Sequence, residues 1–377
     1  MKKLIIICLV LLGVSSMAVA QRLSVATDPN ATKETVDLYN YLFNIQKKYT
    51  LLGHHDGLAY GHGWRDELGR SDVKTMTGSQ EAVCGLDFGK IEHGHAININ
   101  RVPFDKMRDI VKYAYKQRQV IMICWHVDNP KTYKEGLTYP AGTAWDNSDN
   151  TVVRDILRDG SELNIRFKGW MDLLAAYIKT LKDDDGTPIP FIFRPWHEHT
   201  QAWNWWGKKC ATQEEFIGLW KFTISYLRDH HGIHNMIYAI SPQMDTEGLT
   251  KEDYLFRWPG DEYVDFLGMD CYHGRRWQAF ENNVKNMSEL AKEKNKPCGV
   301  TETGIEGVKY PTYFTEEVLP TLKKNEVSFI VFWRNDDEMQ NHHYLPFKGD
   351  VAEKDFVKFC KDPKILLQKD FKKVGKY

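Results

Sequence analysis

Eight short apolar runs, separated by segments of helical pattern, are the feature that most limits how this chain can fold. The runs are almost continuously apolar, as expected for strands of a sheet that is buried on both faces. They cover residues 49–53, 83–87, 120–125, 190–195, 236–240, 264–270, 297–301 and 328–333. Buried strands that alternate with helices indicate an α/β protein with a parallel sheet.

The segments between these runs carry clear helix signals. Large apolar side chains recur at helical spacing over residues 163–181, which predicts an amphipathic helix. Thr212 and Glu215 form a capping box that predicts the start of another helix. Asp28 and Pro29 predict the start of an N-terminal helix. Its buried stripe would consist of Leu38, Leu42, Ile45 and Tyr49.

Eight strands alternating with helices predict a (β/α)8 barrel, the TIM-barrel fold. The length of 377 residues is sufficient, since such barrels typically need about 250 residues in one domain. An open, doubly wound sheet is the alternative, but no glycine-rich phosphate loop follows the first run. Because no repeat or Pro/Ser-rich linker divides the chain, we expect one catalytic domain over residues 21–377.

Residues 1–20 have the pattern of a secretory signal peptide. Lys2 and Lys3 precede an apolar run over residues 4–14, and Ala18 and Ala20 supply small residues at the cleavage positions. The apolar run is too short to cross a bilayer, and no later stretch of sequence reaches that length. We therefore expect a protein without a membrane span, cleaved before residue 21 and exported to the periplasm or the medium.

Charge and cysteine content narrow the functional class further. The net charge is −1, so no basic excess exists to bind a nucleic-acid backbone. Six cysteines follow residue 20, an even number that would permit disulfides in an oxidising compartment. Four of them lie within apolar runs, where free thiols behave as small hydrophobic groups, so we expect mostly free cysteines. These four are Cys84, Cys124, Cys271 and Cys298.

Polar side chains gather where the expected strands end. In a (β/α)8 barrel, active-site residues lie at the carboxyl ends of the strands. Carboxylates, histidines, tyrosines and tryptophans crowd these positions here. The segments concerned are 53–56, Asp87, 125–128, 194–198, 270–272, 301–303 and 333–336.

Glu198 and Glu302, at the ends of the fourth and seventh runs, are the most informative pair. Glycoside hydrolysis needs one carboxyl group that protonates the leaving oxygen and a second that attacks or activates water. A separation of about 5–5.5 Å gives retention of configuration through a glycosyl-enzyme intermediate. Repulsion between the two groups would keep one proton on the pair at neutral pH, which separates an acid from a nucleophile.

Tryptophans accumulate around the same positions. Flat aromatic rings bind the apolar faces of sugars, while polar groups satisfy the hydroxyls. We expect Trp333 and one tryptophan of the 203–206 segment to line a cleft, and the others to pack in the core. The cluster consists of Trp196, Trp203, Trp205, Trp206 and Trp333.

Several motifs together resemble glycoside hydrolase family 26, which is dominated by β-mannanases. The motifs are residues 193–198 (Phe-Arg-Pro-Trp-His-Glu), 203–207 (Trp-Asn-Trp-Trp-Gly) and 300–304 (Val-Thr-Glu-Thr-Gly). Further matches are residues 53–56, 124–130, 268–272 and 332–336. They keep their order over essentially the whole expected mature chain, which makes the resemblance specific.

The resemblance implies a retaining mechanism. Glu198 would be the general acid/base and Glu302 the nucleophile. Tyr272 would hydrogen-bond Glu302 and steady its charge. His197, next to the acid, and His126 would contact the sugar at the cleavage point.

The resemblance also implies the residues that bind the neighbouring sugars. Trp333 would stack beneath the sugar at the cleavage point, and Trp203 would form a platform on the leaving-group side. Arg334 would help to bind the next sugar on the nonreducing side. Trp196 departs from the family pattern, where an aliphatic residue is common, and would reshape the wall behind the acid.

The implied substrate is a β-1,4-mannan, galactomannan or glucomannan. We expect a monomer without cofactor or metal, although no motif in the sequence specifies the oligomeric state. Mixed-linkage β-glucan and β-1,3-xylan remain alternatives, because mannose and glucose differ only in one axial hydroxyl group at C2. The long segment 133–160 either closes one end of the cleft or is an ordinary surface loop. Endo and exo action therefore both stay open.

Two other classes of protein remain as rivals. A metal-dependent hydrolase would draw on histidines and aspartates at strand ends: His54, His55, Asp56, His126, His197 and Asp270. A His-x-His pair leaving the first strand is absent, and two adjacent histidines in a strand point to opposite faces. A carbohydrate-binding protein without catalysis is the second rival, but such a protein needs neither an acid nor a nucleophile.

Overall fold

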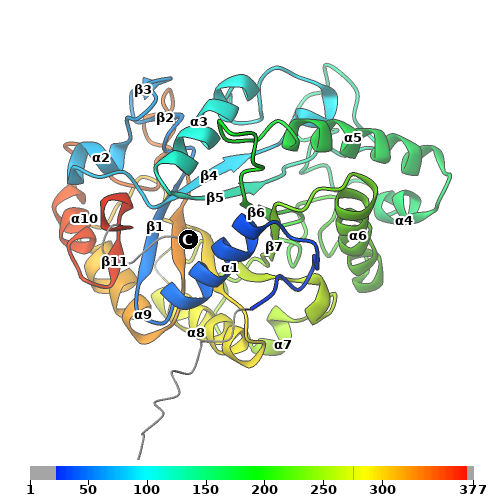
Figure 1. The fold of residues 1–377 in the computed structure, drawn as a ribbon. Helices are drawn as coiled ribbons and strands as arrows, with labels where there is room; N and C mark the ends of the chain where they lie inside the picture. The colour runs from blue at the N-terminus through cyan, green and yellow to red at the C-terminus, as the bar shows by residue number, and fades with distance from the viewer. Residues whose placement is uncertain (1–22, 275, 372–377) are drawn as a thin grey trace, which may run out of the picture.

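Eight parallel strands form a closed barrel in the computed structural model, which describes residues 23–274 and 276–371 (Figure 1). The barrel closes because the last strand pairs in parallel with the first, Leu51 opposite Phe329. The strands are β1 (Thr50–His55), β4 (Val83–Asp87), β5 (Val120–Cys124), β6 (Phe191–Arg194), β7 (Met236–Ile240), β8 (Phe266–Cys271), β9 (Cys298–Thr303) and β10 (Phe329–Phe332). The expected (β/α)8 barrel is thereby confirmed.

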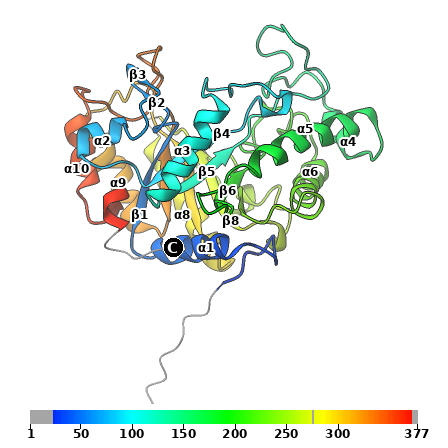
Figure 2. The same ribbon diagram turned by 45° about the horizontal axis from the view of Figure 1, so that its top comes forward.

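Helices surround this barrel on the outside (Figures 1 and 2). They are α1 (Lys33–Ile45), α2 (Asp72–Thr77), α3 (Phe104–Lys116), α4 (Val152–Leu157), α5 (Glu162–Ile178), α6 (Gln213–Ser225), α7 (Lys251–Tyr254), α8 (Trp277–Glu293), α9 (Leu319–Lys324) and α10 (Glu353–Cys360). Shorter elements are β2 (Tyr60–Gly61), β3 (Trp64–Arg65), β11 (Ile365–Leu366), the 3₁₀ turns η1 (Ile91–His93), η3 (Asp261–Tyr263) and η5 (Gln368–Asp370), and the π turns η2 (Tyr226–His230) and η4 (Phe314–Val318).

The helix signals in the sequence are confirmed, with one correction. The expected capping box of Thr212 and Glu215 opens α6. The N-terminal helix, however, begins at Lys33 rather than at Asp28, because the Thr32 hydroxyl caps it by accepting the backbone N–H of Thr35. Asp28 instead accepts the backbone N–H of the residue two positions later and pairs with a histidine before β7.

Helix α1 covers the amino-terminal end of the barrel, away from the β2–β3 hairpin (Figure 2). Leu38, Leu42 and Ile45 are buried, as the sequence predicts, and belong to the same apolar cluster as strand side chains such as Ile192 and Phe329. The expected fourth member of the stripe, at position 49, lies beyond the helix and is half-buried. With one end of the barrel closed in this way, the carboxyl ends of the strands remain accessible.

A second, larger apolar cluster lies between the strands and the outer helices. All six cysteines after residue 20 are buried free thiols, which confirms that the four in apolar runs pack as hydrophobic groups. Within residues 23–274 and 276–371, no helix is both long and apolar enough to span a membrane. The expected signal peptide and its cleavage site fall outside the described residues.

Candidate active site

A cleft of about 400 Å³ opens at the carboxyl ends of the strands. It combines three carboxyl groups with several aromatic rings, which suits a ligand with hydroxyl groups and apolar faces. Its lining residues are His126, Trp145, Glu198, Tyr272, Gly274, Glu302, Gly304, Ile305, Glu306, Trp333 and Tyr344. The structure thus brings together five of the residues expected from the sequence, from strands far apart in the chain.

Glu198 lies just after β6, in a backbone conformation that non-glycine residues rarely adopt, with φ of 56°. Its backbone N–H donates to the carbonyl of Ser241 at 2.7 Å, which helps to hold this turn. The indole Nε1 of Trp203 donates to Oε2 of Glu198 at 2.7 Å. Burial, together with the negative charges of Glu302 and Asp270, raises the pKa of Glu198 well above its usual value.

Glu302, in β9, meets a different environment. The guanidinium group of Arg194 donates to its Oε1, and the hydroxyl of Tyr272 donates to its Oε2 at 2.8 Å. Burial and the nearby carboxylates raise the pKa of Tyr272 well above its usual value, so this hydroxyl remains a donor. Carboxylate oxygens of Glu198 and Glu302 lie within 4.8 Å of one another, with Asp270 in the same group.

Arg194 and Asp270 form a buried pair beneath the two glutamates. Nη1 of Arg194 donates to Asp270 at 2.7 Å, and both side chains are fully buried. Asp270 also accepts hydrogen bonds from the hydroxyls of Ser241 and Thr301, each at 2.8 Å. Burial raises the pKa of Asp270 to about 7, even though Arg194 opposes this shift. The buried cation offsets negative charge that the site would otherwise leave uncompensated.

The sequence contains a signal for this pair that our sequence reasoning did not use. Arg194 and Asp270 are charged residues inside otherwise apolar strands, and a charge at such a position requires a partner. Asp87, the last residue of β4, carries the same signal and proves to be the partner of a histidine in the site.

Asp87, His126 and His197 form a chain of polar contacts whose middle member, His126, lines the cleft. Asp87 Oδ2 lies 2.5 Å from Nδ1 of His126, and Nε2 of His126 lies 2.9 Å from Nε2 of His197. Burial acts to lower the pKa of His126, but the charge of Asp87 and its hydrogen bond outweigh burial and raise it. The side chain of His197 is fully buried, so it lies behind His126 rather than in the cleft wall.

Two of the expected tryptophans lie at the cleft. Trp333 lines it and stacks on His55, with ring centroids 4.3 Å apart, whereas Trp203 is 37% exposed and contacts Glu198. Trp145, which our reasoning missed, comes from the long loop after β5 and lines the cleft next to His126. The remaining tryptophans of the cluster, Trp196, Trp205 and Trp206, are fully buried in the core.

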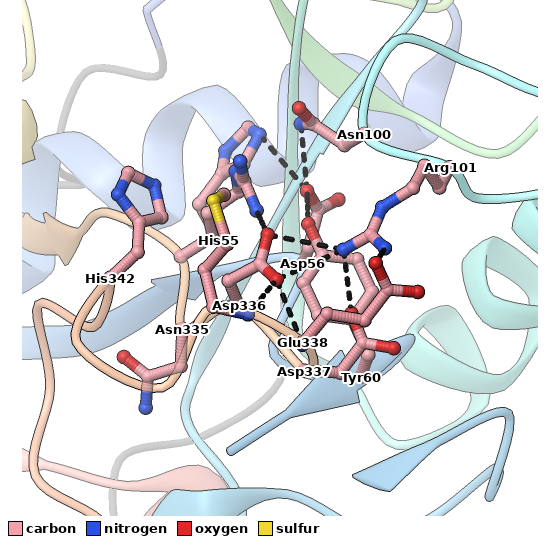
Figure 3. Close-up of polar contacts among 12 residues, drawn as sticks. His55, Asp56, Tyr60, Asn100, Arg101, Asn335, Asp336, Asp337, Glu338 and His342 are labelled. Carbon is pink, nitrogen blue, oxygen red and sulfur yellow. Dashed lines mark hydrogen bonds and ion pairs between the residues drawn. The ribbon is translucent and has the colours of Figure 1, made fainter. Parts of the chain in front are cut away.

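A network of ion pairs holds three loops together, one of them the loop after β10. Figure 3 shows the part of this network around Arg101. Arg101, after β4, pairs with Asp336, Asp337 and Glu338 in the loop after β10. Arg65, in the hairpin after β1, makes two hydrogen bonds to Asp337, at 2.6 and 2.8 Å. β10, β1 and β4 are neighbours in the barrel, so the network joins adjacent loops into one wall.

Arg334 is part of this wall. Its Nη1 donates to Oδ2 of Asp336 at 2.5 Å, and only 15% of its side chain is exposed. The residue expected to bind the neighbouring sugar is therefore held by a carboxylate, and it is not among the side chains that line the cleft.

The positions of the histidines in β1 bear on the alternative of a metal-dependent hydrolase. His55 stacks on Trp333, whereas His54 lies near Asp72 and Asn335, so the adjacent histidines do point apart. Among the described residues, the groups close enough to share an ion include His55 with Asp87 and Cys124, and Glu198 with Asp270 and Glu302. The guanidinium group of Arg194 already supplies positive charge to two of these carboxylates.

A (β/α)8 barrel with paired carboxyl groups and aromatic rings in a cleft at the carboxyl ends of its strands defines a class, the barrel glycoside hydrolases. The comparison with known families agrees with this class and narrows it. The model of "Glycosyl hydrolase family 26" matches residues 27–340, and the chain belongs to this family.

Two curated proteins that are similar in sequence to this chain are both named mannan endo-1,4-beta-mannosidases. A mannan endo-1,4-beta-mannosidase of Bifidobacterium adolescentis is 30% identical over 371 residues, which cover 90% of this chain and 35% of the relative. The chain thus spans only 35% of the length of that curated relative. A mannan endo-1,4-beta-mannosidase of Bacillus subtilis is 24% identical over 80% of this chain and 79% of its own length.

Two solved structures that are similar to this chain are also described as mannanases. A GH26 beta-mannanase of Bacteroides ovatus superposes with a TM-score of 0.85 at 38% identity, covering 92% of this chain and 98% of that one. A modular endo-beta-1,4-mannanase of Cellulomonas fimi superposes with a TM-score of 0.80 at 28% identity, covering 92% and 78% of the two chains.

Proposed function

We propose that this protein is a retaining β-1,4-mannanase in which Glu198 is the general acid/base and Glu302 the nucleophile. The observation that carries the proposal is the pair of carboxyl groups within 4.8 Å in one cleft, in unequal surroundings. Retaining glycosidases place their two carboxyl groups about 5–5.5 Å apart, whereas inverting enzymes leave about 6.5–9.5 Å for a water molecule.

In the first step, a carboxylate oxygen of Glu302 attacks the anomeric carbon, and the bond from that carbon to the leaving oxygen breaks. Glu198 donates its proton to the leaving oxygen, for which its raised pKa suits it. Arg194 and Tyr272 orient the attacking carboxylate through their hydrogen bonds. The leaving sugar departs with the proton and a new hydroxyl group.

In the second step, water attacks the anomeric carbon of the glycosyl ester on Glu302. Glu198, now a carboxylate, takes a proton from this water and returns to its starting state, while Glu302 leaves as a carboxylate. The hydrogen bond from Trp203 to Glu198 stabilises the carboxylate form that this step requires. Two inversions give net retention of configuration.

The aromatic rings and His126 would bind the sugars on either side of the cleaved bond. Trp333 offers a ring in the cleft wall next to Glu302, and Trp203 lies on the side of Glu198. The ring of His126 lines the cleft and would pack against a sugar, since its two nitrogens already contact Asp87 and His197. The names of several relatives favour β-1,4-mannan as the substrate, and one weaker relative is named an endoglucanase.

Product analysis tests the substrate and the mode of action together. The purified protein is incubated with unbranched β-1,4-mannan, galactomannan, mixed-linkage β-glucan and xylan, each in the presence of a strong chelator. Mannose-containing oligosaccharides from the mannans support the proposal, and their lengths distinguish endo from exo action. Products from glucan or xylan alone would transfer the same mechanism to a sister specificity.

Two further outcomes would overturn the proposal. Loss of activity on chelation would favour a metal-dependent hydrolase, and binding of mannan without any product would favour a carbohydrate-binding protein. Glu302→Gln should retain mannan binding and lose turnover, whereas the exposed-site variant Glu67→Gln serves as the control.

The cellular location and assembly state belong to the same proposal. We expect export, with a mature chain of a single domain that acts as a monomer and has no nucleic-acid partner. N-terminal sequencing of the protein purified from its native cells checks the predicted start at Gln21. An intact N-terminus, or sedimentation as a stable dimer, would contradict these expectations.

A further inference from the structure

A cluster of two histidines and one aspartate lies on the outer helices, away from the cleft. Asp172 belongs to α5, and His230 and His231 lie at the end of the π turn η2 that continues α6. One ligand atom of each of the three residues lies within 4.8 Å of the others. Because the helices of a (β/α)8 barrel run antiparallel to its strands, the carboxyl end of α6 is at the end of the barrel opposite the cleft.

The contacts within this cluster already join the two helices. Nε2 of His231 lies 2.8 Å from Oδ1 of Asp172, and the hydroxyl of Tyr226 donates to the same oxygen at 2.8 Å. The ring of His230, an exposed residue, stacks on Tyr226 with centroids 4.7 Å apart and lies beside His231. Burial and the hydrogen bond to Asp172 raise the pKa of Tyr226 to about 12, so its hydroxyl keeps its proton.

The π turn is what brings these groups together. The backbone N–H of His231 donates to the carbonyl of Tyr226, five residues earlier, at 3.1 Å. This wider turn places Tyr226 and His231 on the same side, and both side chains reach Asp172. Such turns are rare within helices and occur frequently at functional sites.

We infer that Asp172, His230 and His231 bind one divalent transition-metal ion of the zinc type, which links α5 to the end of α6. Two imidazoles and one carboxylate are ligands that suit Zn²⁺, and three protein ligands leave the fourth tetrahedral position to water. With bonds of about 2.0–2.1 Å, ligand atoms lie about 3.4 Å apart. The 2.8 Å between His231 and Asp172 must therefore widen slightly, and the exposed ring of His230 must turn toward them. The metal replaces the proton shared by His231 and Asp172, and this proton passes to the solvent.

Titration calorimetry with Zn²⁺ on the metal-free mature protein tests the inference. We expect one Zn²⁺ per chain, and about tenfold or greater weakening of affinity in each of His230→Ala, His231→Ala and Asp172→Asn. His234→Gln is the matched control, because His234 also pairs with an aspartate but does not belong to the three-residue group. Mannan hydrolysis should stay unchanged in all four variants, so failure of this site is distinguishable from failure of the proposed function.

Two results would overturn the inference. One is unchanged Zn²⁺ affinity in the three site variants, which would place the ion elsewhere, for example beside His93 and Asp128. The other is the absence of a bound ion at micromolar protein. A Co²⁺-loaded sample provides a second readout, because a four-coordinate site with nitrogen ligands gives an intense visible absorption that the His231→Ala variant should lose.

Discussion

Glu198 and Glu302 are the same residue type in the same cleft, and their neighbours separate the roles that we propose for them. Glu198 is half-buried near two other carboxylates, and this desolvation and repulsion raise its pKa and favour the protonated form. Glu302 receives hydrogen bonds from a guanidinium group and a phenol, which orient a carboxylate. In the proposed mechanism, the difference between acid and nucleophile therefore depends on Arg194, Asp270 and Tyr272 as much as on the glutamates.

Tyr272→Phe removes one donor to Glu302 without changing the shape of the site. We expect kcat to fall by about 10²-fold, the usual effect of losing one preorganised donor to a developing charge, with little change in folding stability. Steady-state kinetics on soluble galactomannan measures the effect. Tyr115→Phe, at a half-buried position of α3 outside the cleft, is the control. An unchanged kcat in Tyr272→Phe would remove its assigned role.

Asp87→Asn tests the buried pair with His126 through the pH dependence of stability. The pKa of Asp87 is lowered and that of His126 is raised, in each case against burial, because the two groups are paired. The lowered carboxyl pKa gives stability that is present above about pH 4 and lost on acidification. The raised histidine pKa gives stability that is present below about pH 6.5 and lost as pH rises through the folded-state value.

The wild type should therefore exceed Asp87→Asn by about 3 kcal/mol in free energy of unfolding at about pH 5.5, and by clearly less at about pH 9. Urea denaturation of both proteins at the two pH values measures this, with the exposed variant Asp105→Asn as control. A difference that stays constant across this pH range would contradict the charged pairing.

At the scale of elements, the loops after β10, β1 and β4 act as one wall because Arg101 and Arg65 join them. Figure 3 shows the part of this wall around Arg101. This wall includes the segment that carries Trp333 and Arg334. Since the side chain of Arg101 is 39% exposed, its ion pairs contribute little stability, about 1 kcal/mol or less. We therefore expect these ion pairs to act mainly by fixing the positions of the loops that they join.

Arg101→Ala should therefore raise KM for mannan severalfold while leaving kcat and the melting temperature nearly unchanged. Arg70→Ala, which removes an ion pair within a single loop, is the matched control. Kinetics and thermal melting of the two variants together separate positioning from stability. A fall in melting temperature with unaltered KM would show that the network is merely structural.

Elements with strong periodicity could be predicted from the sequence, and contacts between distant loops could not. Runs such as 83–87 and 236–240 coincide with β4 and β7, because a strand buried on both faces leaves a continuous apolar signature. The start of α1 was misplaced since Asp28 and Thr32 are both good cap residues, and only a tertiary contact of Asp28 with His234 decides between them.

The candidate site shows the same limit. Glu198 and Glu302 could be placed at strand ends because barrel topology brings these ends together. Side-chain packing places His197 behind His126. The path of a long loop brings Trp145 to the cleft. The spacing of residues in the sequence predicts neither of these positions.

At the scale of the whole molecule, stability comes from a barrel packed on both sides and closed by α1, without covalent links among the described residues. The six thiols should therefore resist a thiol reagent in the native protein and react in denaturant. Reductant should leave the melting temperature unchanged. Fewer than six reactive thiols in denaturant without reductant would reveal disulfides and contradict this account.

The central claim is that Glu198 and Glu302 catalyse double displacement on β-1,4-mannosides, and the stereochemistry of the first product tests it most directly. Proton NMR during the first minutes of manno-oligosaccharide hydrolysis distinguishes the two anomers before they equilibrate. We predict that the β-anomer accumulates first, as two successive inversions require. Initial release of the α-anomer would show a single displacement by water and would contradict the role of Glu302 as nucleophile.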